Sequence, residues 1–307
     1  MTTVLTEIRD QVGILTLNRP RAINALTREM IDILYATLQD WASNDRVSQV
    51  RLVGAGERGL CSGADVRTLR EQVLAGGSGE ATSFFHHEYE LNRLIAHYPK
   101  PYQALMTGIT MGGGLGLSTH GRQRIVDASS RLAMPETIIG FYPDVGVLWQ
   151  LSQAPGELGT YLALTGATAT AAVAVRAGLA DPGSGYPDDP VADFIGHCFV
   201  GDDPVAIADA LAGHPDPAVQ QALAAIRARS PLSVCVTLAA LRRAQQMRSV
   251  DEVLDQDRAI APAIIRRPDF TEGVRAQLVD KDRRPHWSYA RIEDVPAAEV
   301  EAVLAGS

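Results

Sequence analysis

The sequence predicts an α/β fold that is followed by a helical C-terminal region. In the first half of the chain, short apolar stretches typical of strands alternate with longer stretches whose apolar residues recur at helical spacing. From about residue 189 onward the strand signals stop, and segments rich in Ala, Leu and Arg dominate as far as Ala305. Residues 181–190 are rich in Pro and Gly and separate the two parts. We therefore expect an α/β core over residues 1–188 and a helical region over residues 189–307.

The predicted core begins with a β-hairpin and a helix. Apolar and polar residues alternate at residues 4–9 and 14–18, which flank a turn at residues 10–13. Thr27 has a side chain that commonly caps a helix, and the segment after it has one apolar face. The residues of that face are Met30, Ile33, Leu34, Leu38 and Trp41.

Short strands and helices then continue to about residue 134. The predicted strands are residues 50–53, 102–106, 124–126 and 132–134. One helix is expected to end near Leu74, another to cover residues 81–97, and a third to start at the glycines of residues 112–114. Residues 76–79 contain three glycines and predict a flexible loop.

Composition and charge exclude several classes of function. The chain has 307 residues, 46% of them apolar, and a formal net charge of -8 with a pI near 5.4. Nucleic-acid binding needs clustered Lys and Arg, so no nucleic-acid partner is expected. No apolar run approaches the roughly 18 residues that span a bilayer, so no membrane partner is expected. Residues 1–7 lack the basic and apolar regions of a secretory signal, which leads us to expect a cytoplasmic location.

Cysteine and histidine spacing gives no sign of a metal centre. The cysteines, Cys61, Cys198 and Cys235, are far apart and form no CxxC pair, so neither disulfides nor a zinc site is expected. His86 and His87 are adjacent in a predicted helix, where neighbouring side chains diverge. We therefore expect no bound metal.

Two carboxylates in one short apolar run are the best indication of chemistry. Glu136 and Asp144 lie near the two ends of residues 134–146, each beside a Pro or Gly that restricts or shapes its backbone. Apolar surroundings raise the pKa of a carboxyl group, and two such acids can act as an acid/base pair. Each acid could instead be a charge at the end of a short helix.

Two glycine-rich turns supply exposed backbone N–H groups. Residues 112–114 lead into a predicted helix, and residues 62–66 do the same, so the N–H groups of Ala64 and Gly113 could bind one carbonyl oxygen between them. Neither turn has the spacing of a P-loop or a dinucleotide site. The glycines of residues 112–114 could also serve only to let a helix pack closely. Ser118 and His120 are too poorly placed on a helix to favour a serine triad.

These residues resemble the enoyl-CoA hydratase/isomerase (crotonase) superfamily over nearly the whole chain, and within it the 3-hydroxyisobutyryl-CoA hydrolases. The superfamily segments are residues 18–26, 62–65 and 108–114. The segments similar to the hydrolases are residues 116–122, 134–137, 143–146, 270–276 and 280–282. Hydratases of this superfamily typically carry a Glu at the position of Gly116, which is missing here.

The resemblance implies a crotonase-like ββα superhelix core and an enzyme that cleaves the thioester of a short branched 3-hydroxyacyl-CoA, such as 3-hydroxyisobutyryl-CoA in valine breakdown. It assigns the thioester oxygen to the N–H groups of Ala64 and Gly113. Glu136 would attack the carbonyl carbon or activate water, and Asp144 would transfer protons or hold the 3-hydroxyl group. Further residues implied to contact the substrate are Glu88, Gly112 and Ala22.

Other consequences of the resemblance concern partners and alternatives. No cofactor is implied, because coenzyme A enters as part of the substrate. The helical region covers the active site or packs between subunits in relatives, so a homo-oligomer is one expectation. An enoyl-CoA hydratase or isomerase and a non-catalytic acyl-CoA-binding subunit are the alternative functions. Residues 147–149, Val-Leu-Trp, depart from the hydrolase pattern, which predicts a reshaped acyl pocket.

Overall fold

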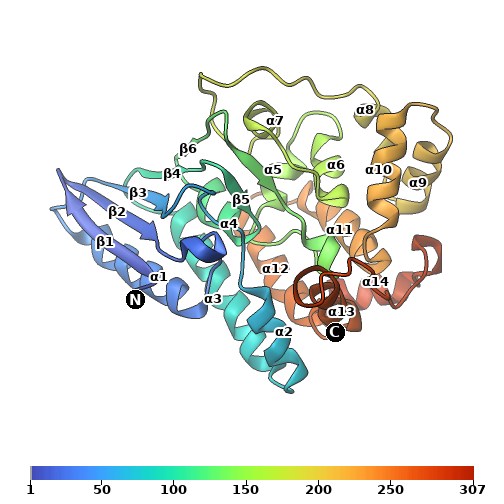
Figure 1. Ribbon diagram of the computed structural model, residues 1–307, viewed down its shortest axis with the longest axis horizontal. Helices are drawn as coiled ribbons and strands as arrows, with labels where there is room; N and C mark the ends of the chain where they lie inside the picture. The colour runs from blue at the N-terminus through green and yellow to red at the C-terminus, as the bar shows by residue number, and fades with distance from the viewer. Residues whose placement is uncertain (1) are drawn as a thin grey trace.

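A computed structural model describes residues 2–307 and shows a twisted N-terminal sheet at one end of the molecule and the C-terminal helices at the other (Figure 1). The five-stranded sheet has the order β1-β2-β3-β4-β6. Strand β1 pairs with β2 in antiparallel fashion, and the other strands are parallel. The strand bounds are β1 Val4–Arg9, β2 Val12–Leu17, β3 Gln49–Gly54, β4 Tyr102–Leu105 and β6 Gln123–Ile125.

The chain also forms a second, parallel sheet of two strands. It pairs β5, Ile109–Met111, with β7, Arg131–Ala133. Strand β5 was not expected from the sequence, because three residues are too few to show an alternating pattern. Its position matters, since it leads directly into the glycines at residues 112–114.

The predicted hairpin and first helix are confirmed. Asp10 and Gln11 form the turn between β1 and β2 with φ values of 49° and 61°, as a type I′ turn requires. Helix α1 covers Arg28–Ser43, and the Thr27 side chain accepts a hydrogen bond of 3.3 Å from the backbone N–H of Met30. The hairpin and α1 therefore follow from local sequence.

The helices that precede the site are α2, Val66–Leu74, α3, Ser78–Ala96, and α4, Gly113–Thr119. Helix α3 starts within the stretch expected to be a loop. Asp65 stands at the N-cap position of α2, but its side chain makes no capping hydrogen bond. Its carboxylate instead pairs with Arg19 at 3.0 Å.

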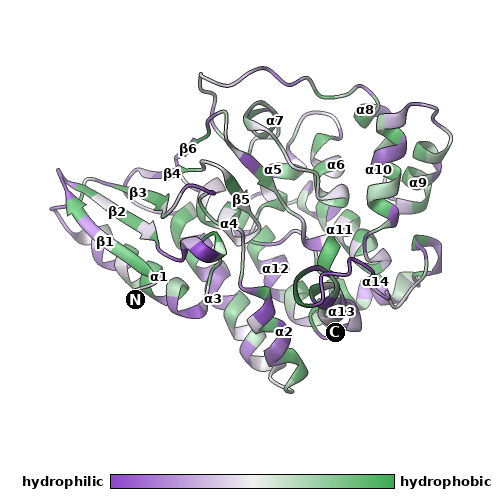
Figure 2. Ribbon diagram, viewed as in Figure 1, coloured by the Kyte–Doolittle hydropathy of each residue, from purple (hydrophilic) through white to green (hydrophobic). Residues whose placement is uncertain are grey.

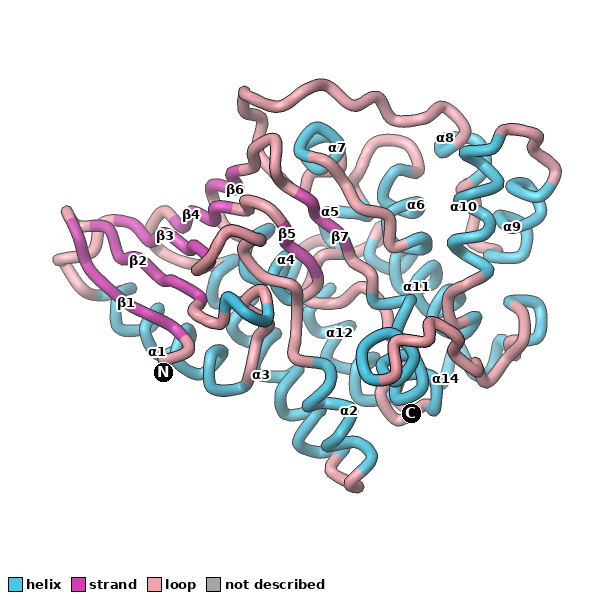
Figure 3. Tube along the Cα trace, viewed as in Figure 1, coloured by secondary structure: helices cyan, strands magenta, loops and turns pink. Residues whose placement is uncertain are grey.

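Helices dominate after strand β7 (Figure 3). The α-helices are α5 Leu148–Ser152, α6 Leu158–Thr165, α7 Ala171–Arg176, α8 Ile195–Cys198, α9 Pro204–Ala212, α10 Pro217–Arg227, α11 Pro231–Ala244, α12 Val250–Ile264, α13 Pro268–Val274 and α14 Ala297–Leu304. Shorter helical turns are η1 Pro20–Ala22, η2 Glu136–Ile139, the π-helix η3 Arg275–Val279 and η4 Ile292–Asp294. Helices α5 to α7 precede residue 189, and the domain boundary at residue 188 stays a prediction.

One large apolar core joins the two parts of the chain, since it contains residues from Val4 to Leu304. A smaller core lies among α9, α10 and α11. Helices α9 and α10 carry both apolar and polar stretches, as expected of helices that bury one face (Figure 2). Across residues 2–307, no single helix meets the length and hydropathy needed to cross a membrane; α10 and α11 meet it only as a pair, bent by 106°.

Candidate active site

The expected site residues meet in one cleft of about 830 Å³. Its walls come from the loop before α1, the starts of α2 and α4, helix α3, the loop around η2, and the segment that contains α13 and η3. The lining includes Ala22, Ala64, Glu88, Gly113, Glu136 and Asp144. Gly112 is not part of the lining, and its backbone N–H donates to the Ala133 carbonyl oxygen at 3.2 Å.

The two glycine-rich turns lie against each other. A Cβ atom built on Gly63 would lie 3.7 Å from the nitrogen of Gly113, so the backbones of the two turns are close neighbours. Gly63 and Gly112 have φ values of 100° and 51°, which favour glycine. Within residues 2–307, neither the Ala64 N–H nor the Gly113 N–H donates a hydrogen bond to another group. Both groups are therefore available to an oxygen in the cleft.

Glu88 and Glu136 flank the Gly112–Gly113 backbone. A Cβ on Gly112 would lie 2.7 Å from Glu136 Oε1, and a Cβ on Gly113 would collide with Glu88 Oε1. Both side chains are buried, and Glu88 Oε1 and Glu136 Oε2 have no hydrogen-bond partner among the described residues. Glu136 begins η2, but its carboxyl group lines the cleft. Two acids are thus held beside the free N–H groups.

Burial sets the protonation of these acids. Burial, and then the charge of Asp144, raise the pKa of both Glu88 and Glu136 well above the usual value for glutamate. Burial raises the pKa of Asp144 to about 7, although a hydrogen bond from Tyr89 opposes the shift. No cation contributes to any of these shifts. The three acids therefore lose their protons at higher pH than exposed carboxyl groups do, and they can exchange protons with a substrate.

Asp144 is aimed by a strained turn. The Tyr89 hydroxyl donates to Asp144 Oδ2 at 2.7 Å. The next residue, Val145, has a φ of 55°, which a β-branched residue rarely adopts and which costs on the order of 1–3 kcal/mol. His120 Nε2 donates to the Val145 carbonyl oxygen at 2.7 Å and so carries the ring proton. Such strain persists only where surrounding contacts hold it, which is typical of functional sites.

Two residues that hold this turn, Asp257 and Tyr89, were missed by sequence reasoning. The Tyr142 hydroxyl donates to Asp257 Oδ1 at 2.8 Å, and the Gly146 N–H donates to Asp257 Oδ2 at 2.7 Å. Asp257 lies on α12, more than a hundred residues after the turn, and no local pattern indicates such a contact. Tyr89 directly follows Glu88 on α3, and that adjacency is the one available signal for it.

Gly116 has no room for the acid of a hydratase. A Cβ atom at this position would lie 2.7 Å from Val145 Cβ and 2.9 Å from Asn92 Nδ2. The left-handed turn thus places the Val145 side chain where a side chain on residue 116 would begin. An acid at that position would require the turn at Val145 and the Asn92 side chain to move.

The cleft has an apolar interior and a cationic mouth. Three aromatic rings from α3, the loop after η2 and α13 pack together, with Phe141 5.0 Å from Phe85 and 5.9 Å from Phe270 between ring centroids. The basic residues of the lining are Arg19, Arg21, Arg58, Arg67 and Lys281, and all but Arg19 are exposed. An acyl group suits the interior, and an anion suits the mouth.

The C-terminal segment forms one wall of the cleft. Phe270, Gln277, Leu278 and Lys281 belong to the lining. Arg70 of α2 donates to the Thr271 carbonyl oxygen at 2.8 Å, and Arg67 donates to that of Leu278. Arg275 pairs with carboxylates on three residues, Glu272, Asp280 and Asp282, at 2.6–2.8 Å. The bonds of Arg67 and Arg70 join the wall to α2, and the ion pairs of Arg275 brace the wall itself.

Several other sequence signals lie outside the cleft. Val147 and Leu148, which were expected to reshape the acyl pocket, are fully buried and do not line it. The Ser118 hydroxyl donates to the Gly114 carbonyl oxygen and not to His120. His86 and His87 bond elsewhere, and no group of three or more His, Cys, Asp or Glu side chains in residues 2–307 could hold a metal ion.

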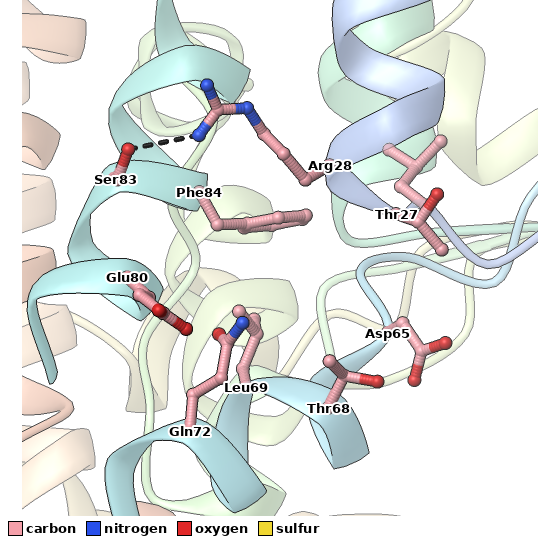
Figure 4. Close-up of a pocket in the computed structure, with 10 residues that line it drawn as sticks. Thr27, Arg28, Asp65, Thr68, Leu69, Gln72, Glu80, Ser83 and Phe84 are labelled. Atoms are coloured by element: carbon pink, nitrogen blue, oxygen red, sulfur yellow. Dashed lines mark hydrogen bonds between the residues drawn. The ribbon is translucent and has the colours of Figure 1, made fainter. Parts of the chain in front are cut away.

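A smaller cavity of about 260 Å³ lies behind the site between α1, α2 and α3 (Figure 4). Leu26, Leu69 and Phe84 line its apolar part, and Arg28 crosses it to bond the Ser83 hydroxyl at 3.0 Å. None of the acids near Gly113 lines it. The larger cleft is therefore the candidate active site.

The pKa of Asp144 gives a prediction for stability. Because the carboxyl group titrates near 3.8 when exposed and about 7 in the folded protein, its contribution to stability is full below pH 3.8 and is lost as the pH rises towards 7. Asp144→Asn has no such group. We expect the free energy of unfolding of the wild type to fall relative to this variant by a few kcal/mol between about pH 4 and pH 8. Urea unfolding at several pH values measures this; a constant difference would contradict it.

Comparisons with known proteins agree with this geometry. A family model described as enoyl-CoA hydratase/isomerase matches residues 12–184 and 182–304. Curated relatives named 3-hydroxyisobutyryl-CoA hydrolase, mitochondrial, include one from Rattus norvegicus, 34% identical over 95% of this chain and 86% of its own. One from Danio rerio is 36% identical over the same shares.

Two solved structures match almost completely. A carnitinyl-CoA dehydratase from Mycobacterium thermoresistibile is 39% identical with a TM-score of 0.94, and an enoyl-CoA hydratase from Rhodobacter sphaeroides 2.4.1 is 35% identical with a TM-score of 0.94. Each match covers 99% of this chain and 97% of the other. The expected crotonase-like core with a helical C-terminal region is confirmed. The chain belongs to the enoyl-CoA hydratase/isomerase family of enzymes.

Proposed function

We propose that this enzyme hydrolyses the thioester of a short branched 3-hydroxyacyl-CoA, with 3-hydroxyisobutyryl-CoA of valine breakdown as the preferred substrate. The observation that carries this proposal is the meeting of two free N–H groups, those of Ala64 and Gly113, with Glu136 and Asp144 in one cleft. The lack of an acid at Gly116 supports hydrolysis over water addition. The identity of the acyl group, 3-hydroxyisobutyryl, is proposed from the names of the curated relatives.

In the proposed reaction, the thioester oxygen binds between the N–H groups of Ala64 and Gly113, which stabilise the negative charge that develops on it. A C–O bond forms to the carbonyl carbon, either from the Glu136 carboxylate or from a water molecule that Glu136 deprotonates. The C–S bond breaks, and the thiolate of coenzyme A takes a proton. Where Glu136 itself attacked, water then cleaves the resulting anhydride, which releases the acid and restores the Glu136 carboxylate. Glu136 must be ionised for the first step, whereas a proton donor must be protonated for the second.

Asp144 suits the role of proton donor, because a pKa of about 7 leaves much of it protonated at neutral pH. In the alternative, Asp144 holds the 3-hydroxyl group, which can donate a hydrogen bond to its carboxyl group. We place Glu88, Gly112 and Ala22 as substrate contacts: Glu88 beside the acyl group, Ala22 towards coenzyme A, and Gly112 through the backbone that presents Gly113.

The cationic mouth fits the phosphates of coenzyme A. Arg21, Arg58, Arg67 and Lys281 are exposed and line the entrance, away from the buried acids. If these basic residues bind the phosphates of coenzyme A, the acyl end of the substrate lies in the aromatic interior of the cleft. We propose that no cofactor is needed beyond the coenzyme A that the substrate carries.

Two alternatives follow from particular observations. The solved structures carry the names carnitinyl-CoA dehydratase and enoyl-CoA hydratase at 39% and 35% identity, which favours addition or removal of water. Against it stands Val145, which fills the space of an acid at residue 116. A non-catalytic acyl-CoA-binding subunit is the second alternative, and the retained Glu136 and Asp144 disfavour it.

One assay separates these functions. The protein is incubated with 3-hydroxyisobutyryl-CoA and, separately, with crotonyl-CoA, while free thiol and enoyl absorbance are followed. We expect thiol release from the hydroxyacyl substrate. Reversible hydration of crotonyl-CoA without thiol release would refute the hydrolase, and tight binding with neither reaction would favour the binding subunit.

Location and assembly are further proposals. We keep a cytoplasmic location as a proposal, although the curated relatives from rat and zebrafish are named as mitochondrial proteins. A homo-oligomer is supported only by the resemblance to the family. Fractionation of the native host cell and sedimentation of the purified protein would test these two proposals.

A further inference from the structure

Helix α12 buries a carboxylate that the proposed chemistry does not use. Asp257 is fully buried and forms no ion pair within residues 2–307. A buried acid without a cation lowers stability unless its oxygens are hydrogen-bonded. Here one oxygen accepts from the Tyr142 hydroxyl and the other from the Gly146 N–H. Both donors belong to the segment that carries Asp144.

That segment is a tight turn with an unfavourable residue in it. The Val147 N–H donates to the Asp144 carbonyl oxygen at 3.1 Å, and the two central residues, Val145 and Gly146, have φ values of 55° and 74°. This is the geometry of a type I′ turn, whose first central position suits Asn, Asp or Gly. Valine at that position needs outside contacts to hold the turn.

The contacts that hold the turn act on successive residues. Tyr89 binds the Asp144 carboxylate, His120 binds the Val145 carbonyl, and Asp257 binds the Gly146 N–H. Only the last contact comes from the helical C-terminal region. It directs the peptide group that follows the strained residue, together with His120, which binds the carbonyl oxygen of the same peptide group. Loss of this acceptor would leave His120 alone to hold that peptide group and would favour the return of Val145 to a common conformation.

We propose that Asp257 is a positioning residue of the active site, which holds the 144–147 turn in its left-handed form and thereby fixes the Asp144 carboxyl group beside Glu136. Its effect on turnover rests on the proposed hydrolase function, whereas its effect on the turn does not. Asp257 lines no part of the cleft and touches no substrate. The chemistry is therefore left to Glu136 and Asp144.

The test is Asp257→Asn, which keeps the shape but leaves one acceptor oxygen for two donors, so that either the Gly146 N–H loses its acceptor or the bond to the Tyr142 hydroxyl is reversed. We expect kcat for 3-hydroxyisobutyryl-CoA to fall roughly 30- to 100-fold, the size of effect that follows misplacement of a reacting group by about 1 Å. KM should stay within about twofold, because the aromatic interior and the cationic mouth are unchanged.

Asp269→Asn is the matched control. Asp269 is also buried without an ion pair in the described chain, and it accepts hydrogen bonds from Ser230 and Ser288. Both variants should lower the melting temperature, but only Asp257→Asn should lower kcat. Equal changes in kcat for the two variants would make Asp257 a structural residue and overturn the proposal.

A second variant tests the strain directly. Val145→Gly removes the steric penalty of the left-handed conformation. In the Asp257→Asn background it should raise kcat about fivefold above that of Asp257→Asn alone, a coupling expected only if both residues act on one turn. Independent, additive losses would contradict the proposal.

Crystal structures separate this proposal from the proposed function. In Asp257→Asn we expect Val145 to leave the left-handed region and Asp144 to lose its bond to Tyr89. If the wild type releases no thiol, the hydrolase function is wrong, and the crystal structure alone decides the role of Asp257. A turn that is unchanged in the variant would refute the positioning role.

Discussion

Glu136→Gln abolishes thiol release from 3-hydroxyisobutyryl-CoA in our expectation, with kcat lower by roughly 10³-fold or more. The amide keeps the size of the side chain but can neither attack the carbonyl carbon nor accept a proton from water. Because the aromatic interior and the basic mouth remain, binding of coenzyme A should change by less than about threefold. Single-turnover kinetics and calorimetric titration with coenzyme A measure the two quantities.

The same substitution should stabilise the fold at alkaline pH. Burial raises the pKa of Glu136 well above the usual range, so ionisation of this group in the folded state is unfavourable, and a neutral side chain removes that penalty. Glu90→Gln is a suitable control, since Glu90 is a surface acid on α3 that pairs with Arg258. Turnover close to that of the wild type in Glu136→Gln would refute the assigned role.

Gly116→Glu should destabilise the protein severely and should not create a hydratase. The new Cβ atom would lie 2.7 Å from Val145 Cβ, and the carboxylate would enter a buried region that already holds other acids without cations. Overpacking costs about 1–3 kcal/mol, and an unpaired buried carboxylate adds to that. We expect a loss of more than about 3 kcal/mol in the free energy of unfolding, measured with urea.

Gly116→Ala is the matched control, because it adds the Cβ atom without the charge. Its loss of stability should be clearly smaller than that of Gly116→Glu. A stable Gly116→Glu protein that hydrates crotonyl-CoA would show that the missing acid alone separates this chain from hydratases. It would also show that the position of Val145 is not decisive.

Local sequence predicted the parts of the fold that local contacts determine. Thr27 caps α1 through its own hydroxyl, and the β1–β2 hairpin closes through a two-residue turn. The glycines at residues 112–114 also indicated a turn into a helix. The structure explains why they are glycines, since a side chain on Gly112 or Gly113 would collide with Glu136 or Glu88. Strand β5 escaped prediction, since three residues cannot establish a period.

The candidate site was predictable where chemistry requires particular residue types, and not where a distant side chain completes it. Glu136 and Asp144 were evident from their apolar surroundings and from the resemblance to the family. Asp257 was not, because its contact with Gly146 depends on how α12 packs on α3 and α5. The left-handed conformation of Val145 was equally hidden, since valine disfavours it.

The C-terminal wall of the cleft has a consequence for biosynthesis. Phe270, Gln277, Leu278 and Lys281 complete a site whose other residues lie before residue 145, so the cleft is incomplete until residue 281 has left the ribosome. A nascent chain that stops short of Arg275 also lacks the ion pairs that fix this wall. During synthesis, Glu136 and Asp144 therefore lack this wall of the cleft until the C-terminal segment has folded against α2.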